Sequence, residues 1–146
     1  LRSLVGSEMC IRDRYKTEDA EHLIITLGSL GAEAVPAVDL LRAQNIKTGL
    51  INLKAYRPFP AKELRALLET KKTVSVFEKN VSYGYEGALA SDLKAALYDL
   101  NNAPIIKSVV CGLGGRNVSF KEIADTTLKI INKQITDSTA YWLRAD

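Results

Sequence analysis

The sequence predicts an α/β fold of three layers, in which a mostly parallel β-sheet lies between two layers of helices. Three observations predict it. Four short apolar runs alternate along the chain with four segments of helical periodicity. The runs are almost continuously apolar, which is typical of strands covered on both faces. At least ten residues separate each run from the next, which is long enough for a helical crossover between parallel strands.

The first strand and helix open this pattern. His22–Gly28 is the first apolar run, and small residues follow it as a turn. A helix is expected over Ala32–Gln44, because apolar residues recur along it at helical spacing. As the only histidine, His22 could be catalytic, but its place at the start of a strand favours a structural role.

A stiff loop follows the second strand, which is expected over Thr48–Ala55. The loop, Tyr56–Pro60, contains two prolines that flank one aromatic residue. Each proline lacks a backbone N–H and fixes φ, so the strand cannot continue through it. A helix is then expected over Pro60–Glu69, with its proline near the first turn.

The second half of the chain repeats the alternation twice. The third strand is expected over Thr73–Glu78 and the third helix over Gly87–Leu100, which carries leucines on one stripe. The fourth strand is expected over Ile105–Val110, and a glycine-rich loop, Cys111–Asn117, follows it. A capping box, formed by Ser119 and a glutamate three residues later, predicts the start of the fourth helix.

Composition places the chain among ordinary globular proteins. Apolar residues make up 47% and charged residues 25% of its 146 residues, a length that suits one domain. The net charge is +3 without a long Lys/Arg block, which argues against a nucleic-acid partner. No apolar stretch approaches the roughly 20 residues that span a bilayer. We therefore expect a cytoplasmic protein whose partners include neither a membrane nor a nucleic acid.

The cysteines and acidic residues predict no catalytic or metal centre. Two cysteines, Cys10 and Cys111, and one histidine are too few for a disulfide framework, a zinc site or a locally bound iron–sulfur cluster. A reactive Cys111 would need a positive neighbour such as Arg116, and a buried, unreactive thiol is favoured instead. Glu78 and Glu86 are too isolated in the sequence to predict a general acid/base pair.

The first fourteen residues have a separate interpretation. Leu4–Asp13 reads as the in-frame translation of a transposase adaptor used in sequencing libraries. We therefore expect residues 1–14 to be a non-native segment, leave them out of the predicted fold, and assign residues 15–146 to the domain. The start at Leu1 rather than at a methionine fits a gene fragment.

The four strand-to-helix loops should lie at one edge of the sheet, because the carboxyl ends of parallel strands meet there. This placement gathers Arg57, Lys79, Tyr83, Tyr85 and Arg116 on that edge. Arg57 could bind a carboxylate or a phosphate in a bidentate manner, or pair with an acid of a neighbouring domain, which is the favoured role. The two tyrosines predict a surface patch for a protein partner.

The glycine-rich loop is the second candidate binding element. Gly112–Arg116 could cradle a phosphate with its backbone N–H groups beside a helix N-terminus. It matches neither GxGxxG nor a Walker loop, so a tight turn is the favoured alternative. No catalytic residue is predicted. The candidate contacts for an interface or an anion are Arg57, Asn80, Tyr83, Gly84, Gly114 and Arg116.

Five motifs carry a family resemblance. They are Thr17–Glu21, Gly28–Ser29, Tyr56–Pro60, Glu78–Gly84 and Gly112–Asn117, in this order. Together they resemble the alpha subunit of pyruvate:ferredoxin oxidoreductase (pyruvate synthase), over residues 15 to about 143. The resemblance is to the second domain of that subunit. It implies a fold like the C-terminal domain of transketolase, in whose relatives the last strand is antiparallel.

The resemblance implies a part in the oxidative decarboxylation of pyruvate in anaerobic metabolism. In that family thiamine diphosphate with magnesium forms the adduct, coenzyme A takes the acetyl group, and iron–sulfur clusters pass electrons to ferredoxin. The implied partners are the beta, gamma and delta subunits and the first domain of the alpha subunit, which would precede Tyr15. The chain contains no Gly-Asp-Gly motif and no cysteine set. We therefore expect it to bind no cofactor, to be inactive alone and to support assembly.

Three alternatives stay open. Relatives that act on 2-oxoisovalerate or 2-oxoglutarate share this domain, although Tyr56–Pro60 and Gly112–Arg116 favour pyruvate. A stand-alone nucleotide-binding α/β domain could use the glycine-rich loop, and binding of coenzyme A, ADP or NAD would support it. The same domain could also belong to another thiamine enzyme, such as a transketolase or an oxoacid dehydrogenase beta chain.

Overall fold

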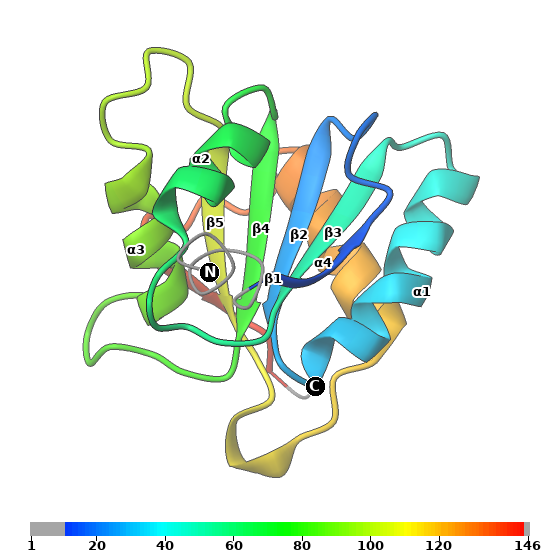
Figure 1. The fold of residues 1–146 in the computed structure, drawn as a ribbon. Helices are drawn as coiled ribbons and strands as arrows, with labels where there is room; N and C mark the ends of the chain where they lie inside the picture. Colours follow the sequence, from blue (N-terminus) through cyan, green and yellow to red (C-terminus); the bar gives the residue numbers. More distant parts are fainter. Residues whose placement is uncertain (1–10, 145–146) are drawn as a thin grey trace.

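A β-sheet with helices packed on both faces makes up the computed structural model, which describes residues 11–144 (Figure 1). The predicted alternation of strands and helices is confirmed, and with it the three-layer α/β fold. The alternating elements are β2 (His22–Leu27), α1 (Leu30–Ala43), β3 (Thr48–Leu53), α2 (Ala61–Leu68), β4 (Thr73–Glu78), α3 (Ala88–Ala96), β5 (Ile105–Val110) and α4 (Phe120–Ile131).

Two short outer strands extend this sheet to the order β1-β3-β2-β4-β5-β6. β6 (Ala140–Trp142) pairs in parallel with β5, so the antiparallel last strand implied by the transketolase resemblance is wrong. The antiparallel strand is instead the first one, β1 (Ile11–Tyr15), which pairs with β3. The direction of each outer strand follows from the segment that connects it to the rest of the sheet. Helix α4 carries the chain across the sheet before β6, whereas the link from β1 to β2 is too short for a crossover.

β1 brings into the sheet residues that the sequence analysis left outside the fold. Ile11 lies opposite Leu53 and Tyr15 opposite Leu50, with a shift in register between Ile11 and Asp13. Because of this bulge, Ile11 and Tyr15 pack on different faces of the sheet, so the strand shows no two-residue periodicity. Residues 1–10 lie outside the described residues. The non-native origin of residues 1–14 stays a prediction.

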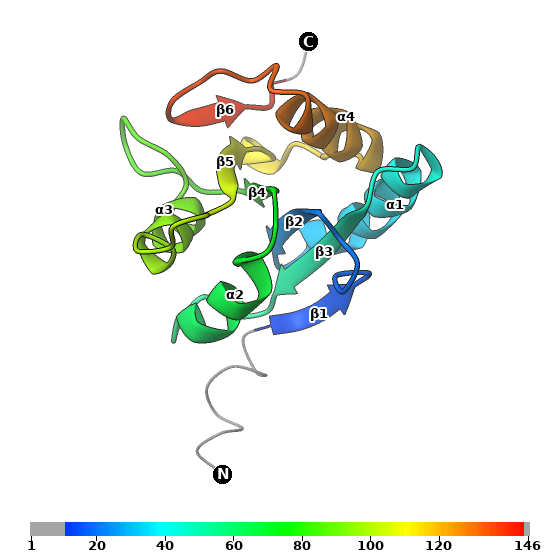
Figure 2. The same ribbon diagram turned by 90° about the horizontal axis from the view of Figure 1, so that it is seen from above.

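The sheet separates two hydrophobic cores. Helices α1 and α4 cover one face and α2 and α3 cover the other, as the view in Figure 2 shows. Neighbouring residues of one strand point to opposite cores: Ile24 packs with α1 and α4, whereas Leu23 and Ile25 pack on the other side. All three are fully buried. This two-sided burial explains why the strands are apolar without alternation.

The strand order creates a switch point at the middle of the sheet. From β2 the chain crosses to β3 on one side, and from β4 it crosses to β5 on the other side. The loops after β2 and β4 therefore diverge from adjacent strand ends. Open α/β sheets bind ligands in the crevice at such a point.

Candidate functional site

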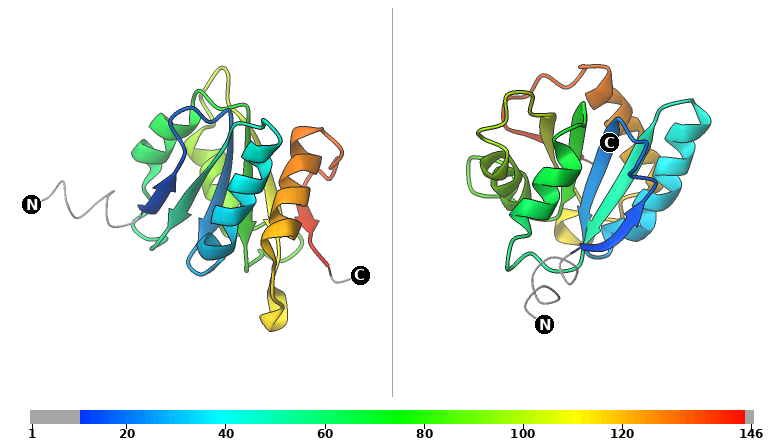
Figure 3. Two further views of the ribbon diagram at one scale, coloured as in Figure 1. Left: turned by 90° about the vertical axis from the view of Figure 1, so that its right-hand side faces the viewer. Right: turned by 45° about the horizontal axis from the view of Figure 1, so that its top comes forward.

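The loops that follow β2, β3, β4 and β5 lie at one edge of the sheet, as the sequence predicts. We call this the strand-end edge; it comprises residues 28–29, 54–60, 79–87 and 112–118. The short helical turn Leu113–Gly115 projects beyond the strand ends, as Figure 1 and the left view of Figure 3 show. The edge thus presents a set of loops outside the two cores.

Arg57, in the loop after β3, has a partner within the chain. Its Nη1 lies 3.0 Å from the carboxylate of Asp92 on α3, and its guanidinium lies 4.1 Å from the centre of the Tyr56 ring. The hydroxyl of Tyr56 donates to the same carboxylate and, at 3.2 Å, to the carbonyl of Ala88. The Arg57–Pro58 peptide is cis. These contacts fasten the loop to the start of α3, and an interface role for Arg57 stays a prediction.

Two buried carboxylates, which the sequence analysis considered too isolated to act together, anchor the loop after β4. Glu78 is 1% exposed, and its carboxylate accepts hydrogen bonds from the N–H groups of Leu89 at 3.0 Å and Ala90 at 3.1 Å. It therefore caps the N-terminus of α3, where Gly87 supplies no side chain. Burial raises the pKa of Glu78, and the two backbone hydrogen bonds oppose that shift.

Glu86 holds the other end of the same loop. It is also 1% exposed, pairs with the ammonium of Lys94 and accepts a hydrogen bond of 3.1 Å from the Ser91 hydroxyl. Lys94 and Ser91 both belong to α3. One signal for these anchors was present in the sequence. Helix α3 begins after Gly87 without a Ser, Thr, Asp or Asn cap, so its N–H groups need an acceptor from elsewhere, which Glu78 supplies.

Between these anchors the loop is open to solvent. Tyr83 and Tyr85 are 106% and 54% exposed, and Gly84 between them has φ +67. The side chain of Asn80 accepts a hydrogen bond of 3.2 Å from the N–H of Ala88, so it is a second cap of α3. Tyr83 and Tyr85 are thus the large side chains that this loop exposes to solvent.

The glycine-rich loop after β5 is fastened by an arginine. Arg116 donates to Glu122 at 2.5 Å and to the carbonyl of Leu143 at 3.2 Å, which ties the loop to α4 and to the segment after β6. The predicted capping box is confirmed, because Ser119 and Glu122 exchange hydrogen bonds at the start of α4. Gly114 has φ +68 with open space where a side chain would stand.

Cys111 and His22 have the structural roles that the sequence favours. Cys111 is 1% exposed, and burial raises the pKa of its thiol to about 11, so the nucleophilic thiolate is disfavoured. His22 bonds to the hydroxyl of Thr73 at 2.8 Å, at the opposite end of the strands. Within residues 11–144, no three His, Cys, Asp or Glu side chains gather as a metal site would require.

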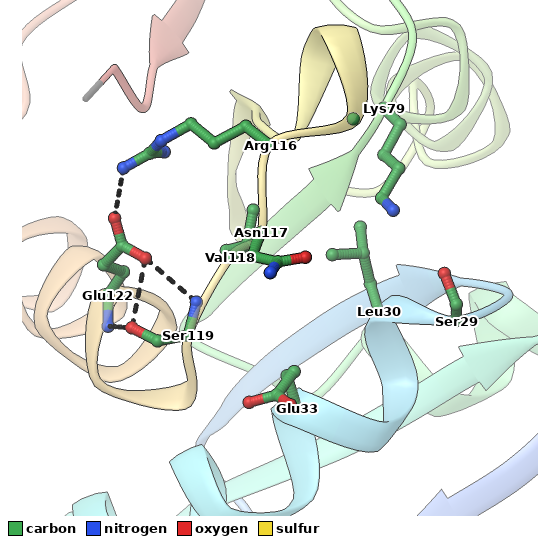
Figure 4. A pocket seen from close by; sticks show the side chains of 10 residues that line it. Ser29, Leu30, Glu33, Lys79, Arg116, Asn117, Val118, Ser119 and Glu122 are labelled. Atoms are coloured by element: carbon green, nitrogen blue, oxygen red, sulfur yellow. Dashed lines mark hydrogen bonds and ion pairs between the residues drawn. The ribbon is translucent and has the colours of Figure 1, made fainter.

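A hollow of about 480 Å³ lies at the switch point (Figure 4). Ser29 and Leu30 line it from the end of β2, Lys79 from the end of β4, and Asn117 from the loop after β5. Arg116 also lines it, whereas Arg57, Tyr83 and Gly114 do not. The predicted site residues thus share one edge but do not converge on a single site. The loop Gly28–Gly31 was the less favoured phosphate candidate in the sequence, and neither Ser29 nor Asn117 was among the named contacts.

Comparison with known proteins assigns the family. A family model described as pyruvate:ferredoxin oxidoreductase core domain II matches residues 20–123, which is more than half of the chain. The chain belongs to this family. The resemblance found in the sequence is therefore confirmed.

Curated relatives match this core domain II chain over most of its length. Ketoisovalerate oxidoreductase subunit VorA of Pyrococcus furiosus is 38% identical over 128 residues, which are 86% of this chain and 32% of the relative. Pyruvate synthase subunit PorA of Thermotoga maritima is 38% identical over 137 residues, 93% of this chain and 35% of the relative. The chain thus spans about a third of the length of these relatives.

Two solved structures share the fold of this core domain II. A 2-oxoglutarate:ferredoxin oxidoreductase from Magnetococcus marinus matches 82% of this chain and 19% of its own, with a TM-score of 0.58 and 24% identity. A split-gene transketolase matches 82% of this chain and 41% of its own, with a TM-score of 0.63 and 17% identity. The transketolase-like fold is confirmed. No helix in residues 11–144 combines the length and the apolar character needed to cross a membrane.

Proposed function

We propose that this chain is the second core domain of the alpha subunit of a pyruvate synthase. The complete enzyme would decarboxylate pyruvate oxidatively with thiamine diphosphate and magnesium, transfer the acetyl group to coenzyme A, and pass electrons through iron–sulfur clusters to ferredoxin in the cytoplasm. The observation that carries this proposal is the 38% identity to the Thermotoga maritima pyruvate synthase subunit over 93% of this chain.

The task of this domain is to support assembly, and the chemistry belongs to other parts of the enzyme. Thiamine diphosphate, magnesium and the clusters would be held by the first domain of the alpha subunit and by the beta, gamma and delta subunits. The strand-end edge supports this role, because Tyr83, Tyr85 and Leu113 are exposed there at 106%, 54% and 42%. Large exposed apolar side chains at one edge are typical of a protein interface.

Substrate choice has a second candidate with specific support. The ketoisovalerate oxidoreductase subunit VorA has the same identity, 38%, over 86% of this chain. The test is to express the complete gene that encodes this chain with the genes of its partner subunits. The purified complex is then assayed for ferredoxin reduction with pyruvate, 2-oxoisovalerate and 2-oxoglutarate. We expect kcat/KM for pyruvate to exceed the values for the other two substrates at least tenfold. A preference for 2-oxoisovalerate would contradict the substrate proposal.

The assembly role is tested in the same complex. Tyr83→Ala with Tyr85→Ala should reduce the fraction of the alpha subunit that co-purifies with its partners. Tyr98→Ala is the matched control, because Tyr98 is 90% exposed but follows α3 at the opposite end of the sheet from these loops. Equal recovery of the double variant and the Tyr98→Ala control would contradict the proposed interface.

A further inference from the structure

Two carboxylates line the hollow at the switch point, and both already accept hydrogen bonds from backbone N–H groups. Glu33 accepts a hydrogen bond of 3.1 Å from the N–H of Phe120 at the start of α4. Glu122 accepts one of 2.9 Å from the N–H of Ser119 and pairs with Arg116 at 2.5 Å. The Ser119 backbone hydrogen bond holds the pKa of Glu122 below its ordinary value. The charge of Arg116 is therefore balanced within the wall of the hollow.

Lys79 differs from Arg116 because its ammonium group has no ion-pair partner, although the carboxylate of Glu33 lines the same hollow. Within residues 11–144 no hydrogen bond or ion pair is made by its ammonium group. Figure 4 shows the side chain extending from the end of β4 across the hollow toward Ser29 and Leu30, which begin α1. A cation without a direct ion-pair partner therefore faces the hollow.

Neutral hydrogen-bonding groups lie around this cation. The hydroxyl of Ser29 makes no capping hydrogen bond to α1, and the amide of Asn117 points into the same space in Figure 4. The 14-residue helix α1 turns its N-terminus toward the hollow, which favours negative charge there. Gly115 contributes open backbone to the wall, with φ +80 and nothing within 4 Å of the place where a Cβ would stand.

We propose that this crevice binds a phosphate group, with Lys79 as the cation and Ser29 and Asn117 as hydrogen-bond donors. The place agrees with the rule that open α/β sheets bind ligands at the switch point. The hollow, about 480 Å³ in volume, has the size of a small-molecule site. Arg116, which the sequence suggested as an interface or anion contact, holds the loop through Glu122 and Leu143 and is not part of this proposal. The proposal goes beyond the assembly role and does not depend on it.

Nuclear magnetic resonance on the 146-residue chain tests the proposal. Backbone amide resonances are followed while inorganic phosphate, pyrophosphate or ADP is added at constant ionic strength, with chloride as the reference anion. We expect saturable shifts centred on Ser29, Lys79 and Asn117 with phosphate and pyrophosphate. ADP that binds at least tenfold more tightly than pyrophosphate would identify a nucleotide as the ligand, and equal affinities would identify the phosphate group alone.

Two lysine variants separate this site from general attraction of anions. Lys79→Met should weaken pyrophosphate binding at least fivefold. Lys54→Met is the matched control, because Lys54 is also exposed at the strand-end edge but does not line the hollow, and it should bind as the unchanged chain does. Both variants remove one positive charge from the surface. Shifts that do not saturate, or equal weakening by the two substitutions, would overturn the proposal.

Discussion

The loops after β4 and β5 leave adjacent strands at the same edge, yet the protein fastens them in different ways. The loop after β4 is held at both ends by carboxylates that are 1% exposed, Glu78 and Glu86. The loop after β5 is held by Arg116 and Glu122, whose side chains are 28% and 31% exposed. A buried polar contact is costly to break and an exposed ion pair is not. The two ends of the first loop are therefore anchored in the domain's core, and the second loop is attached nearer its surface.

Substitution of the glycine at each loop should give the largest difference. At Gly87 a Cβ would stand 2.1 Å from the carboxyl carbon of Glu78, so Gly87→Ala must displace the buried carboxylate. We expect it to lower the free energy of unfolding by about 3 kcal/mol, as overpacking does. At Gly114 the space is open and φ is +68, so Gly114→Ala should cost only about 1 kcal/mol of backbone strain. Urea denaturation measures both, and equal losses would contradict the comparison.

The carboxylates themselves should give the next largest difference. Glu78→Gln keeps the size of the side chain but turns a donor toward one of the two N–H groups that Glu78 now accepts from. We expect a loss of about 2 kcal/mol, because a buried N–H is left without a partner. Glu122→Gln can still cap α4 and gives up mainly an ion pair that is only partly buried, so its loss should be below about 1 kcal/mol. A larger loss for Glu122→Gln would reverse the assignment of core and surface.

Glu78 and Glu122 should make the free energy of unfolding depend on pH with opposite signs. Burial raises the pKa of Glu78 above its ordinary 4.5, so the folded state binds the proton more tightly and stability falls as the pH rises above 4.5. The pKa of Glu122 is lowered from 4.5, so its contribution is present above pH 4.5 and is lost as the pH falls. The free energy of unfolding is measured for the unchanged chain, Glu78→Gln and Glu122→Gln between about pH 3 and 8. The difference between the unchanged chain and each variant, plotted against pH, gives the slope for that carboxylate. Slopes of the same sign would contradict the prediction.

The smallest effect is expected at the tip of the first loop. Tyr83 is 106% exposed, so Tyr83→Ala should change the free energy of unfolding by less than about 0.5 kcal/mol. The anchors of the loop would then be independent of its tip. A thermal melt of this variant beside that of Gly87→Ala gives the measurement, and a drop in Tm comparable to the Gly87→Ala value would show that the tip packs on the domain.

The local signals in the sequence fix the alternating elements but say little about the anchors. The apolar runs predict β2 to β5, and Ser119 with its partner predicts the start of α4, because these depend on neighbours in the sequence. The capping of α3 by Glu78 joins residues 11 and 12 positions apart, and its burial follows from the packing of a whole helix on the sheet. β1 was missed because four of its five residues, 11–14, were left out of the predicted fold, and its bulge also removes the two-residue period. The hollow was missed because it depends on the strand order, which places Ser29 beside Lys79.

The pairing of the outer strands determines where the described residues 11–144 begin and end. Ile11 lies opposite Leu53 at the carboxyl end of β3, because β1 is antiparallel, and Trp142 lies opposite Val110 at the carboxyl end of β5. Chain entry and chain exit are therefore both at the strand-end edge, about 24 Å apart across five strand spacings. Covalent linkage and loop contacts would then act on one side of the sheet. The opposite edge, where the strands begin, carries neither end of the described residues.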